Sequence, residues 1–416
     1  MMTISKKIIP FIILFFIISI NQILSNEVLL GIDVLERQNF SILNGKRVGL
    51  ITNQTGVNKK LELTIDIFKR AKNFKLVSVF APEHGVKGLV GAGQLFDSFY
   101  DSTDGIMYYA LYGKTSKPTK QMLSNIDVLV YDIQDIGVRS YTYISTLGLA
   151  LEAAGENNVE FVVLDRPNPL GGYRIEGNVV EDEFKSFVSQ FEIPYVYGLT
   201  CGELATILNE KKSIGNKTKC KLTVVKMKGW KRWMKFQDTD LVWVPTSPNV
   251  PQKETPFYLV ATGVLGELLA FNIGISYTLP FEVIAQEWIN ADTLAKKLND
   301  LKLKGVLFRP ISFKPNYGDW KDKIMNGVQI HITDFDKVNL LEIQFYFLQV
   351  HHKLYPDKNP FEMCNANRLN MFDKVMGTDK IRKEFSKRFL VDDIKPLLDK
   401  DIKWFRELSR RYYLYN

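Results

Sequence analysis

The chain has 416 residues, of which 46% are hydrophobic and 24% are charged, and its formal net charge is +8. This length predicts two domains with buried cores, and the ordinary balance of apolar and charged residues excludes a largely disordered chain. The three cysteines (Cys201, Cys220, Cys364) and the four histidines are irregularly spaced. They support neither a disulfide framework nor a zinc site, so we expect no metal.

The first 25 residues have the pattern of a signal peptide. Lys6 and Lys7 precede an apolar run over residues 8–20, which is short for a membrane span and typical of a signal-peptide core. We expect cleavage near Ser25, with an uncleaved anchor as the alternative. The protein is therefore expected to be exported, periplasmic or secreted, and not stably inserted in a membrane after cleavage.

Apolar β-rich runs alternate with helical stretches through the first half of the chain, which predicts a parallel sheet with helices on both faces. The predicted strands are residues 47–51, 75–80, 127–131 and 160–164, and the predicted helices are residues 64–72 and about 140–155.

Polar side chains follow each predicted strand, and in open α/β sheets ligands bind beyond the carboxyl ends of the strands. Asn53, Glu83, the segment 132–135 and the segment 165–168 are therefore candidate site residues. Capping of the helices that follow is the alternative for any one of them.

Residues 245–251 contain three prolines and predict the end of the first domain. We therefore assign residues 27–250 to the first domain and residues 251–416 to a smaller α/β auxiliary domain. In the second domain we predict a helix over residues 282–298, a strand over 328–332, a helix over 340–352 and a charged helical tail.

The lysines are spread over stretches such as residues 226–235 and 380–387. A nucleic-acid-binding protein would concentrate its charge, so we expect no nucleic-acid partner. Lysines interleaved with Trp230 and Trp233 could stack on bases or sugars, but a solvated helix face is the favoured interpretation.

Several common cofactor and nucleophile motifs are missing from the chain. Gly91-Ala92-Gly93 begins like a dinucleotide loop, but the third glycine is missing and no strand leads directly into it. The chain has neither a phosphate-binding P-loop nor a Gly-x-Ser-x-Gly elbow. We therefore expect no cofactor.

Glu83 lies between Pro82 and His84 in a loop with glycines at positions 85, 88, 91 and 93. Such a loop can aim a carboxyl group and partly withdraw it from water, so that the group keeps the proton that a general acid donates in glycoside cleavage. A helix cap or a surface position is the alternative for Glu83. For His84, bonding to substrate or to Glu83 and a structural role in the loop are equally compatible with the pattern.

The segment 132–143 collects acids, an amide, an arginine and two phenols, which are the groups that bind sugar hydroxyls and cover sugar rings. Asp135 could serve as a second catalytic carboxylate, with Asp132 or Glu203 as alternatives. Arg139 could pair with a substrate carboxylate in a bidentate manner.

These segments resemble the exo-β-N-acetylmuramidase family, and they run in family order. The matching segments are residues 45–56 (GKRVGLITNQTG), 82–85 (PEHG), 132–143 (DIQDIGVRSYTY), 164–172 (LDRPNPLGG), 202–204 (GEL) and 247–249 (SPN). Shorter matches at 266–267, 277–282, 327–331, 372–373 and 377–378 extend the resemblance over nearly all of the chain after the signal segment.

The resemblance implies a Rossmann-like domain and a C-terminal auxiliary domain with a cleft between them. It implies an exo-acting glycosidase that releases N-acetylmuramic acid from the non-reducing ends of peptidoglycan fragments, with Glu83 as catalytic acid and a saccharide or muropeptide as partner. Arg139 or Arg166 would bind the lactyl carboxylate of the sugar. The candidate substrate-binding residues are Asn53, His84, Asp132, Gln134, Arg139, Tyr141, Tyr143, Asp165, Arg166, Asn168, Glu203 and Asn249.

The chain departs from the family pattern at Tyr197, where a basic residue or histidine is frequent, and around residues 266–267 and 276–278. Substrate preference therefore stays open. The alternatives to a muramidase are a non-catalytic envelope protein that binds muropeptides or other glycans, and a hydrolase for another carboxylated or N-acetylated sugar.

Overall fold

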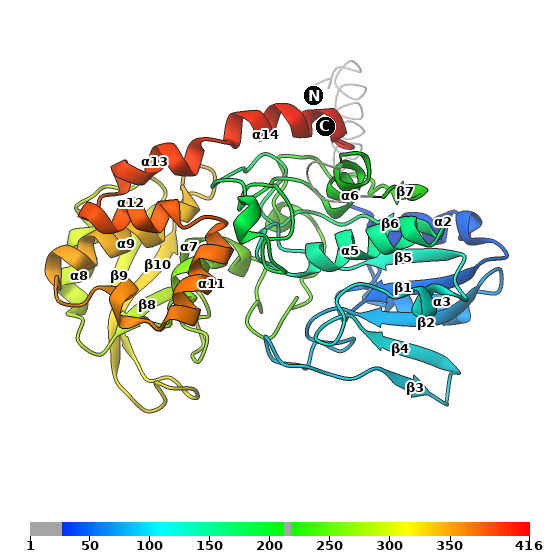
Figure 1. Cartoon of the computed structure of the whole chain (residues 1–416), viewed down its shortest axis with the longest axis horizontal. Helices are drawn as coiled ribbons and strands as arrows, with labels where there is room; N and C mark the ends of the chain where they lie inside the picture. Colours follow the sequence, from blue (N-terminus) through cyan, green and yellow to red (C-terminus); the bar gives the residue numbers. More distant parts are fainter. Residues whose placement is uncertain (1–26, 212–217) are drawn as a thin grey trace, which may run out of the picture.

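Two α/β domains lie side by side in the computed structural model, which describes residues 27–211 and 218–416 (Figure 1). The expected signal peptide, residues 1–25, lies outside the described residues. Within the described ranges no helix is long and apolar enough to cross a membrane.

The first domain is built on a seven-stranded sheet with the order β3-β4-β2-β1-β5-β6-β7. Its strands are β1 (Arg47–Thr52), β2 (Lys75–Ala81), β3 (Phe99–Asp101), β4 (Ile106–Ala110), β5 (Val128–Asp132), β6 (Glu160–Leu164) and β7 (Leu222–Val225). All neighbouring pairs are parallel except β3 with β4. The predicted strands are confirmed. The strand order changes direction between β1 and β5, since β2, β4 and β3 lie on one side of β1 and β5, β6 and β7 on the other.

Helices cover both faces of this sheet, as predicted. Helices α2 (Gly31–Arg37) and α3 (Thr64–Arg70) pack on one face, where Val48 and Leu50 of β1 point. Helices α5 (Tyr143–Glu156) and α6 (Cys201–Glu210) pack on the other face, with Ile51 of β1 and the short helix α4 (Lys120–Leu123). Apolar side chains on the two faces of the sheet thus pack into two separate hydrophobic cores.

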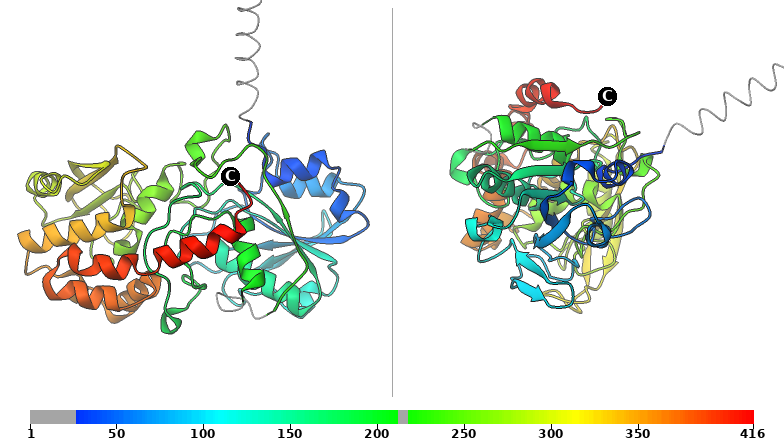
Figure 2. Two further views of the ribbon diagram at one scale, coloured as in Figure 1. Left: turned by 90° about the horizontal axis from the view of Figure 1, so that it is seen from above. Right: turned by 90° about the vertical axis from the view of Figure 1, so that its right-hand side faces the viewer.

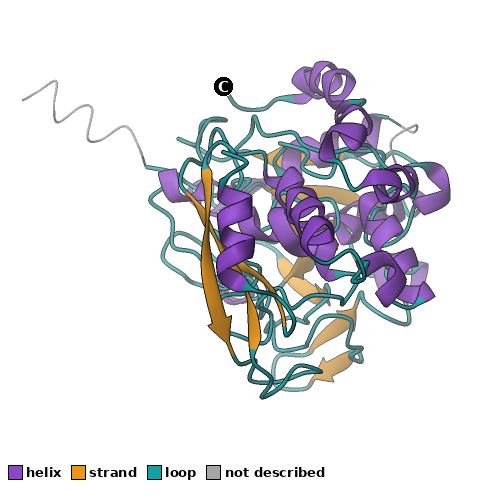
Figure 3. Ribbon diagram, turned by 90° about the vertical axis from the view of Figure 1, so that its left-hand side faces the viewer, coloured by secondary structure: helices purple, strands orange, loops and turns teal. Residues whose placement is uncertain are grey.

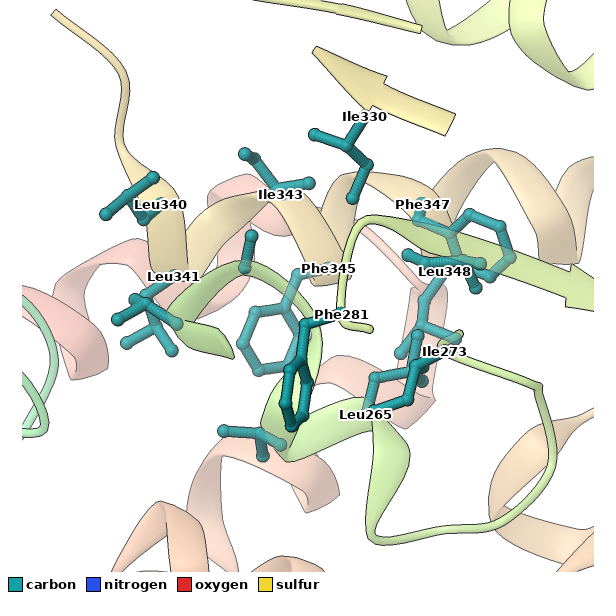
Figure 4. Close-up of a cluster of buried hydrophobic side chains, with 14 of the residues drawn as sticks. Leu265, Ile273, Phe281, Ile330, Leu340, Leu341, Ile343, Phe345, Phe347 and Leu348 are labelled. Carbon is teal, nitrogen blue, oxygen red and sulfur yellow. The ribbon is translucent and has the colours of Figure 1, made fainter. Parts of the chain in front are cut away.

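The second domain holds a three-stranded antiparallel sheet with the order β8-β10-β9. Its elements are α7 (Thr255–Gly266), β8 (Val283–Gln286), α8 (Ala291–Asn299), β9 (Val306–Phe313), β10 (Met325–Ile332), α9 (Leu340–Leu354), α10 (Pro360–Met363), α11 (Ala366–Met376), α12 (Lys380–Arg388) and α13 (Val391–Asp399). Figure 3 shows the helices gathered on one side of the sheet. Side chains from α7, α9 and β10, with Phe281, fill the core between them (Figure 4).

The helix predicted over residues 282–298 is wrong in its first part. Val283 to Gln286 are fully buried and form β8, which pairs with β10. The helix α8 begins only after Asn290, whose side chain accepts a hydrogen bond from the backbone N–H of Thr293. An N-cap of this kind satisfies an N–H that the first helical turn leaves free.

The end of the chain returns to the first domain. Helix α14 (Ile402–Ser409) spans the two domains, and the C-terminus lies over the first one (Figures 1 and 2). Phe405 and Tyr412 enter the core beneath α5 and α6. The hydroxyl of Tyr415 donates to Asp165 at 2.5 Å, so the last residues complete the first domain.

Candidate active site

A cleft of about 340 Å³ lies between the two domains, a size that suits a small saccharide. The first domain contributes residues from the loop after β2, the segment after β4 and the start of α5. The second domain contributes residues from α7, α11 and the loop before β8. The polar side chains that line the cleft are Glu83, His84, Tyr112, Ser140, Tyr141, Thr142, Tyr195, Ser247, Asn249, Glu267 and Arg368.

Glu83 is 8% exposed and is held from two sides. The backbone N–H of Gly93 donates to its Oε1 at 2.9 Å, and the hydroxyl of Thr142 donates to its Oε2 at 2.6 Å. Gly93 adopts a positive φ of 73°, which glycine tolerates. The glycine-rich loop and the start of α5 therefore aim the carboxyl group together, as the loop composition predicted.

Tyr112 is a further partner of Glu83, and no motif in the sequence marked it. Burial, and then the neighbouring Glu83 carboxylate, raises the pKa of Tyr112 to about 12. Its hydroxyl thus keeps its proton near neutral pH. His84 serves the loop, because its Nδ1 lies 2.7 Å from the carbonyl oxygen of Val90 and its ring packs edge-on against Tyr143.

The second domain presents Glu267, which follows α7, and Arg368, in the first turn of α11. Their charged groups are 4.0 Å apart. Burial in the wall of the cleft raises the pKa of Glu267, and Arg368 opposes that shift. Arg368 is 41% exposed, and among the described residues it is the one lysine or arginine that lines the cleft. Glu267 lay within a family match, whereas nothing in the sequence marked Arg368.

Four of the predicted binding residues are buried in the interior and do not line the cleft. Asp132 accepts from Arg166 at 2.6 Å, and Arg166 also donates to the carbonyl of Val57. Asp165 accepts from Thr200 and Tyr415, and Glu203 accepts from Arg232. Asp132, Asp165, Arg166 and Glu203 are at most 4% exposed. They stabilise the strand ends, and Arg166 is not free to bind a lactyl carboxylate.

Asp135 also lies outside the cleft lining, which corrects its placement as a second carboxylate in direct contact with substrate. Its Oδ2 accepts from Gly137 and from the hydroxyl of Tyr197. Burial raises the pKa of Asp135 to about 7, and the bond from Tyr197 opposes that shift. Tyr197, at which the chain departs from the family pattern, is thus buried and paired with Asp135.

Arg139 is 0% exposed, and its N–H groups donate hydrogen bonds to other residues of the protein. Its Nη1 donates to the carbonyls of Asn178 and Ile193, its Nη2 to those of Val375 and Met376, and its Nε to Ser189. The expectation that Arg139 binds a substrate carboxylate is therefore corrected: it ties the end of α11 to the first domain.

The remaining predicted residues divide between the cleft and its surroundings. Tyr141 and Asn249 line the cleft, and Tyr143 is buried beside it, donating to the carbonyl of Thr246. Asn53 borders an adjoining apolar groove of about 810 Å³. Gln134 and Asn168 brace buried loops by donating to the carbonyls of Pro167 and Leu199.

Within residues 27–211 and 218–416, no group of three or more histidine, cysteine, aspartate or glutamate side chains is placed to hold a metal ion. The cleft instead combines two carboxyl groups from different domains, a guanidinium and several hydroxyl groups. Such a set can transfer protons and can bind an anionic sugar.

Comparison with known proteins gives consistent results. Residues 48–254 match the family model described as exo-beta-N-acetylmuramidase NamZ, N-terminal, and residues 258–415 match its C-terminal counterpart. The chain is 42% identical over 385 residues to the peptidoglycan beta-N-acetylmuramidase NamZ of Bacillus subtilis (strain 168), covering 92% of this chain and 91% of that protein.

Two crystal structures of DUF1343 family proteins from Bacteroides fragilis NCTC 9343 are also similar. One is 53% identical, with a TM-score of 0.90 over 94% of this chain and 100% of that chain. The other is 25% identical, with a TM-score of 0.75 over 94% of this chain and 99% of that chain. The two-domain arrangement is therefore shared with solved structures over nearly the whole chain.

Proposed function

The chain belongs to the NamZ exo-β-N-acetylmuramidase family, and from that membership we propose that it releases N-acetylmuramic acid from the non-reducing ends of peptidoglycan fragments. It is a glycosidase. One observation supports the assignment of its active site. The carboxyl group of Glu83 lines the interdomain cleft and accepts hydrogen bonds from Gly93 and Thr142.

We propose that Glu83 protonates the oxygen that leaves when the glycosidic bond breaks. A hydroxyl group can donate to a carboxylate or accept from a carboxylic acid. Thr142, 2.6 Å from Oε2, therefore supports Glu83 in both protonation states. This is what a group that gives up a proton and later recovers it requires.

Glu267 is the proposed second carboxyl group. It faces the same cleft from the other domain, and its pKa is raised by burial. Two carboxyl groups on opposite walls of a sugar-sized cleft match the arrangement by which most glycosidases act. Asp135, Asp132 and Glu203, which the sequence also offered for this role, lie outside the cleft lining.

Arg368 is the proposed partner of the sugar's lactyl carboxylate. N-acetylmuramic acid carries this negative charge, and the carboxyl groups of the cleft would repel it. The exposed guanidinium of Arg368 supplies the opposite charge and a planar set of donors. Recognition of the sugar would thus come from the second domain.

The decisive experiment compares Glu83→Gln with the wild-type enzyme on a chromogenic N-acetylmuramide. We expect turnover to fall by about 10²–10⁴-fold, because general acid catalysis contributes that much. Glu384→Gln is the matched control, since Glu384 pairs with Lys387 on the surface of α12 and does not line the cleft, and it should keep full turnover. Near wild-type turnover by a folded Glu83→Gln enzyme would remove Glu83 from the mechanism. Tight binding of muropeptides by the wild-type protein with no release of sugar from any would favour a glycan-binding protein.

We also propose that the protein is exported, a view supported by the signal-peptide pattern of residues 1–25 and by a substrate that belongs to the cell wall. N-terminal sequencing of the protein recovered from its native cells tests this. A mature chain starting near residue 26 is expected, and a chain that begins at Met1 and stays in the cytoplasm would contradict it.

A further inference from the structure

A second hollow of about 370 Å³ lies on the seam between the domains. Tyr173 and Arg174, after β6, border it together with Trp233, after β7. Lys337, before α9, and Arg406, in α14, complete its rim. It shares no lining residue with the catalytic cleft. In Figure 1 α14 runs along the upper edge of the molecule, whereas α11, which carries Arg368, lies below it.

Two large aromatic side chains at this hollow are exposed to solvent. Trp233 is 55% exposed and Tyr173 is 54% exposed. The solvated helix expected for residues 226–235 is wrong, because this stretch forms loops and turns. Trp230 is buried against Tyr415, while Trp233 is left on the surface. Exposed aromatic groups beside a concavity mark binding sites more often than isolated surface residues do.

The loops that carry the two rings are joined by a buried arginine. The backbone N–H of Gly172 donates to the carbonyl of Arg232, and the Nη2 of Arg232 donates back to the carbonyl of Gly172, both at 2.6 Å. Arg232 is itself paired with Glu203 in the interior. Because Tyr173 and Trp233 directly follow these two residues, their backbones are fixed before any ligand arrives, which lowers the entropy cost of binding.

The hollow is also positively charged. Arg174, Arg232, Lys235, Lys337 and Arg406 line it, against Glu176 and Asp336. Arg174 pairs with Glu176, Lys235 with Asp336, Arg232 with Glu203, and Lys337 with Asp334, although the side chain of Lys337 is 70% exposed. Arg406 has no ion-pair partner within the described part of the chain. An anionic ligand would therefore meet open positive charge beside two aromatic faces.

We propose that this hollow is a second saccharide-binding site, which holds a carboxylated glycan strand away from the catalytic cleft. Tyr173 and Trp233 stack on the apolar faces of sugar rings, and Arg406 and Lys337 attract the carboxylates. The ligand class rests on the proposed function, since every second sugar of peptidoglycan carries a carboxylate, either on its free lactyl group or on the stem peptide joined to that group. A bound strand keeps the enzyme among chain ends and raises their effective concentration at the cleft.

The test measures co-sedimentation with insoluble peptidoglycan from which other anionic polymers have been stripped. All proteins carry Glu83→Gln, so that the strands stay intact. Adding Tyr173→Ala and Trp233→Ala together should weaken retention by about tenfold or more, since the two rings are the stacking surface of the site. Trp404→Ala is the matched control, because Trp404 is an exposed tryptophan of α14 outside the hollow, and retention should stay unchanged.

Three results would overturn the proposal. The first is wild-type retention by the doubly substituted protein. The second is equal retention of the parent protein on chitin, which lacks carboxylates. The third is a loss of turnover of a soluble chromogenic muramide when the two alanines are placed in the active enzyme, because a separate site should leave that turnover within about twofold. Retention does not require turnover, so failure of the proposed activity would appear in the muramide assay and leave this measurement intact.

Discussion

The substitution Asp135→Asn tests whether Asp135 is a buried structural carboxyl group or a catalytic one. Burial raises the pKa of Asp135 from 3.8 to about 7 in the folded protein. Between these values the folded protein holds a proton that the unfolded chain has released, so the stabilising contribution is present at low pH and is lost as the pH rises through 7. From about pH 5 to about pH 7.5 this loss amounts to roughly 2–3 kcal/mol.

An asparagine at this position does not titrate. It can still accept hydrogen bonds from Gly137 and Tyr197, and its amide nitrogen would take the place of Oδ1, which has no hydrogen-bond partner within the described residues. Urea unfolding of both proteins should therefore show the wild-type protein losing roughly 2–3 kcal/mol relative to the variant between about pH 5 and about pH 7.5.

The same variant should cleave a chromogenic muramide at a rate of the same order as the wild-type enzyme. Parallel stability curves would refute the reasoning about burial, and a catalytic loss as large as that of Glu83→Gln would return Asp135 to the active site.

Three further substitutions test the walls of the cleft. Arg139→Met should lower the free energy of unfolding by about 3 kcal/mol or more, because four buried carbonyls each lose one donor. A loss below about 1 kcal/mol in urea denaturation would contradict its role in joining the two domains. Glu267→Gln should reduce kcat by about 10²-fold and remove one limb of the pH–rate profile, whereas a purely structural residue would change the unfolding midpoint and leave that profile intact. Arg368→Gln should reduce kcat/KM for a muramide by about 10-fold to 100-fold and leave an N-acetylglucosaminide unaffected, and equal losses on both sugars would exclude a lactyl partner.

The architecture of the first domain could be read from the sequence because its local and tertiary preferences agree. Runs such as residues 47–52 and 160–164 are apolar, short and bounded by polar turns, and they form β1 and β6. Residues 283–286 could equally have begun the helix that follows them. Only pairing with β10 makes them a strand, and a partner more than 30 residues away leaves no local signal.

The candidate site could be predicted only in part. Glu83, which lines the cleft, could be selected because its loop is unusual in composition. The strand ends also offered Asp132, Asp165 and Arg166, but these residues bond to one another or to distant residues. The sequence pattern does not distinguish a polar group that lines a cleft from one that is paired with a neighbour in the interior. Arg368 reaches the cleft from a helix nearly 300 residues away, so its role depends on how the domains meet.

The bond from Tyr415 to Asp165 has a consequence for the order of events in biosynthesis. Asp165 directly follows β6 of the first domain, yet one of its partners, Tyr415, lies 250 residues further along the chain and is synthesised after the second domain. Until then the first domain lacks a hydrogen bond to a buried carboxylate and the packing of Tyr415 on Trp230. The first domain therefore reaches its full set of contacts only after the second domain has been synthesised.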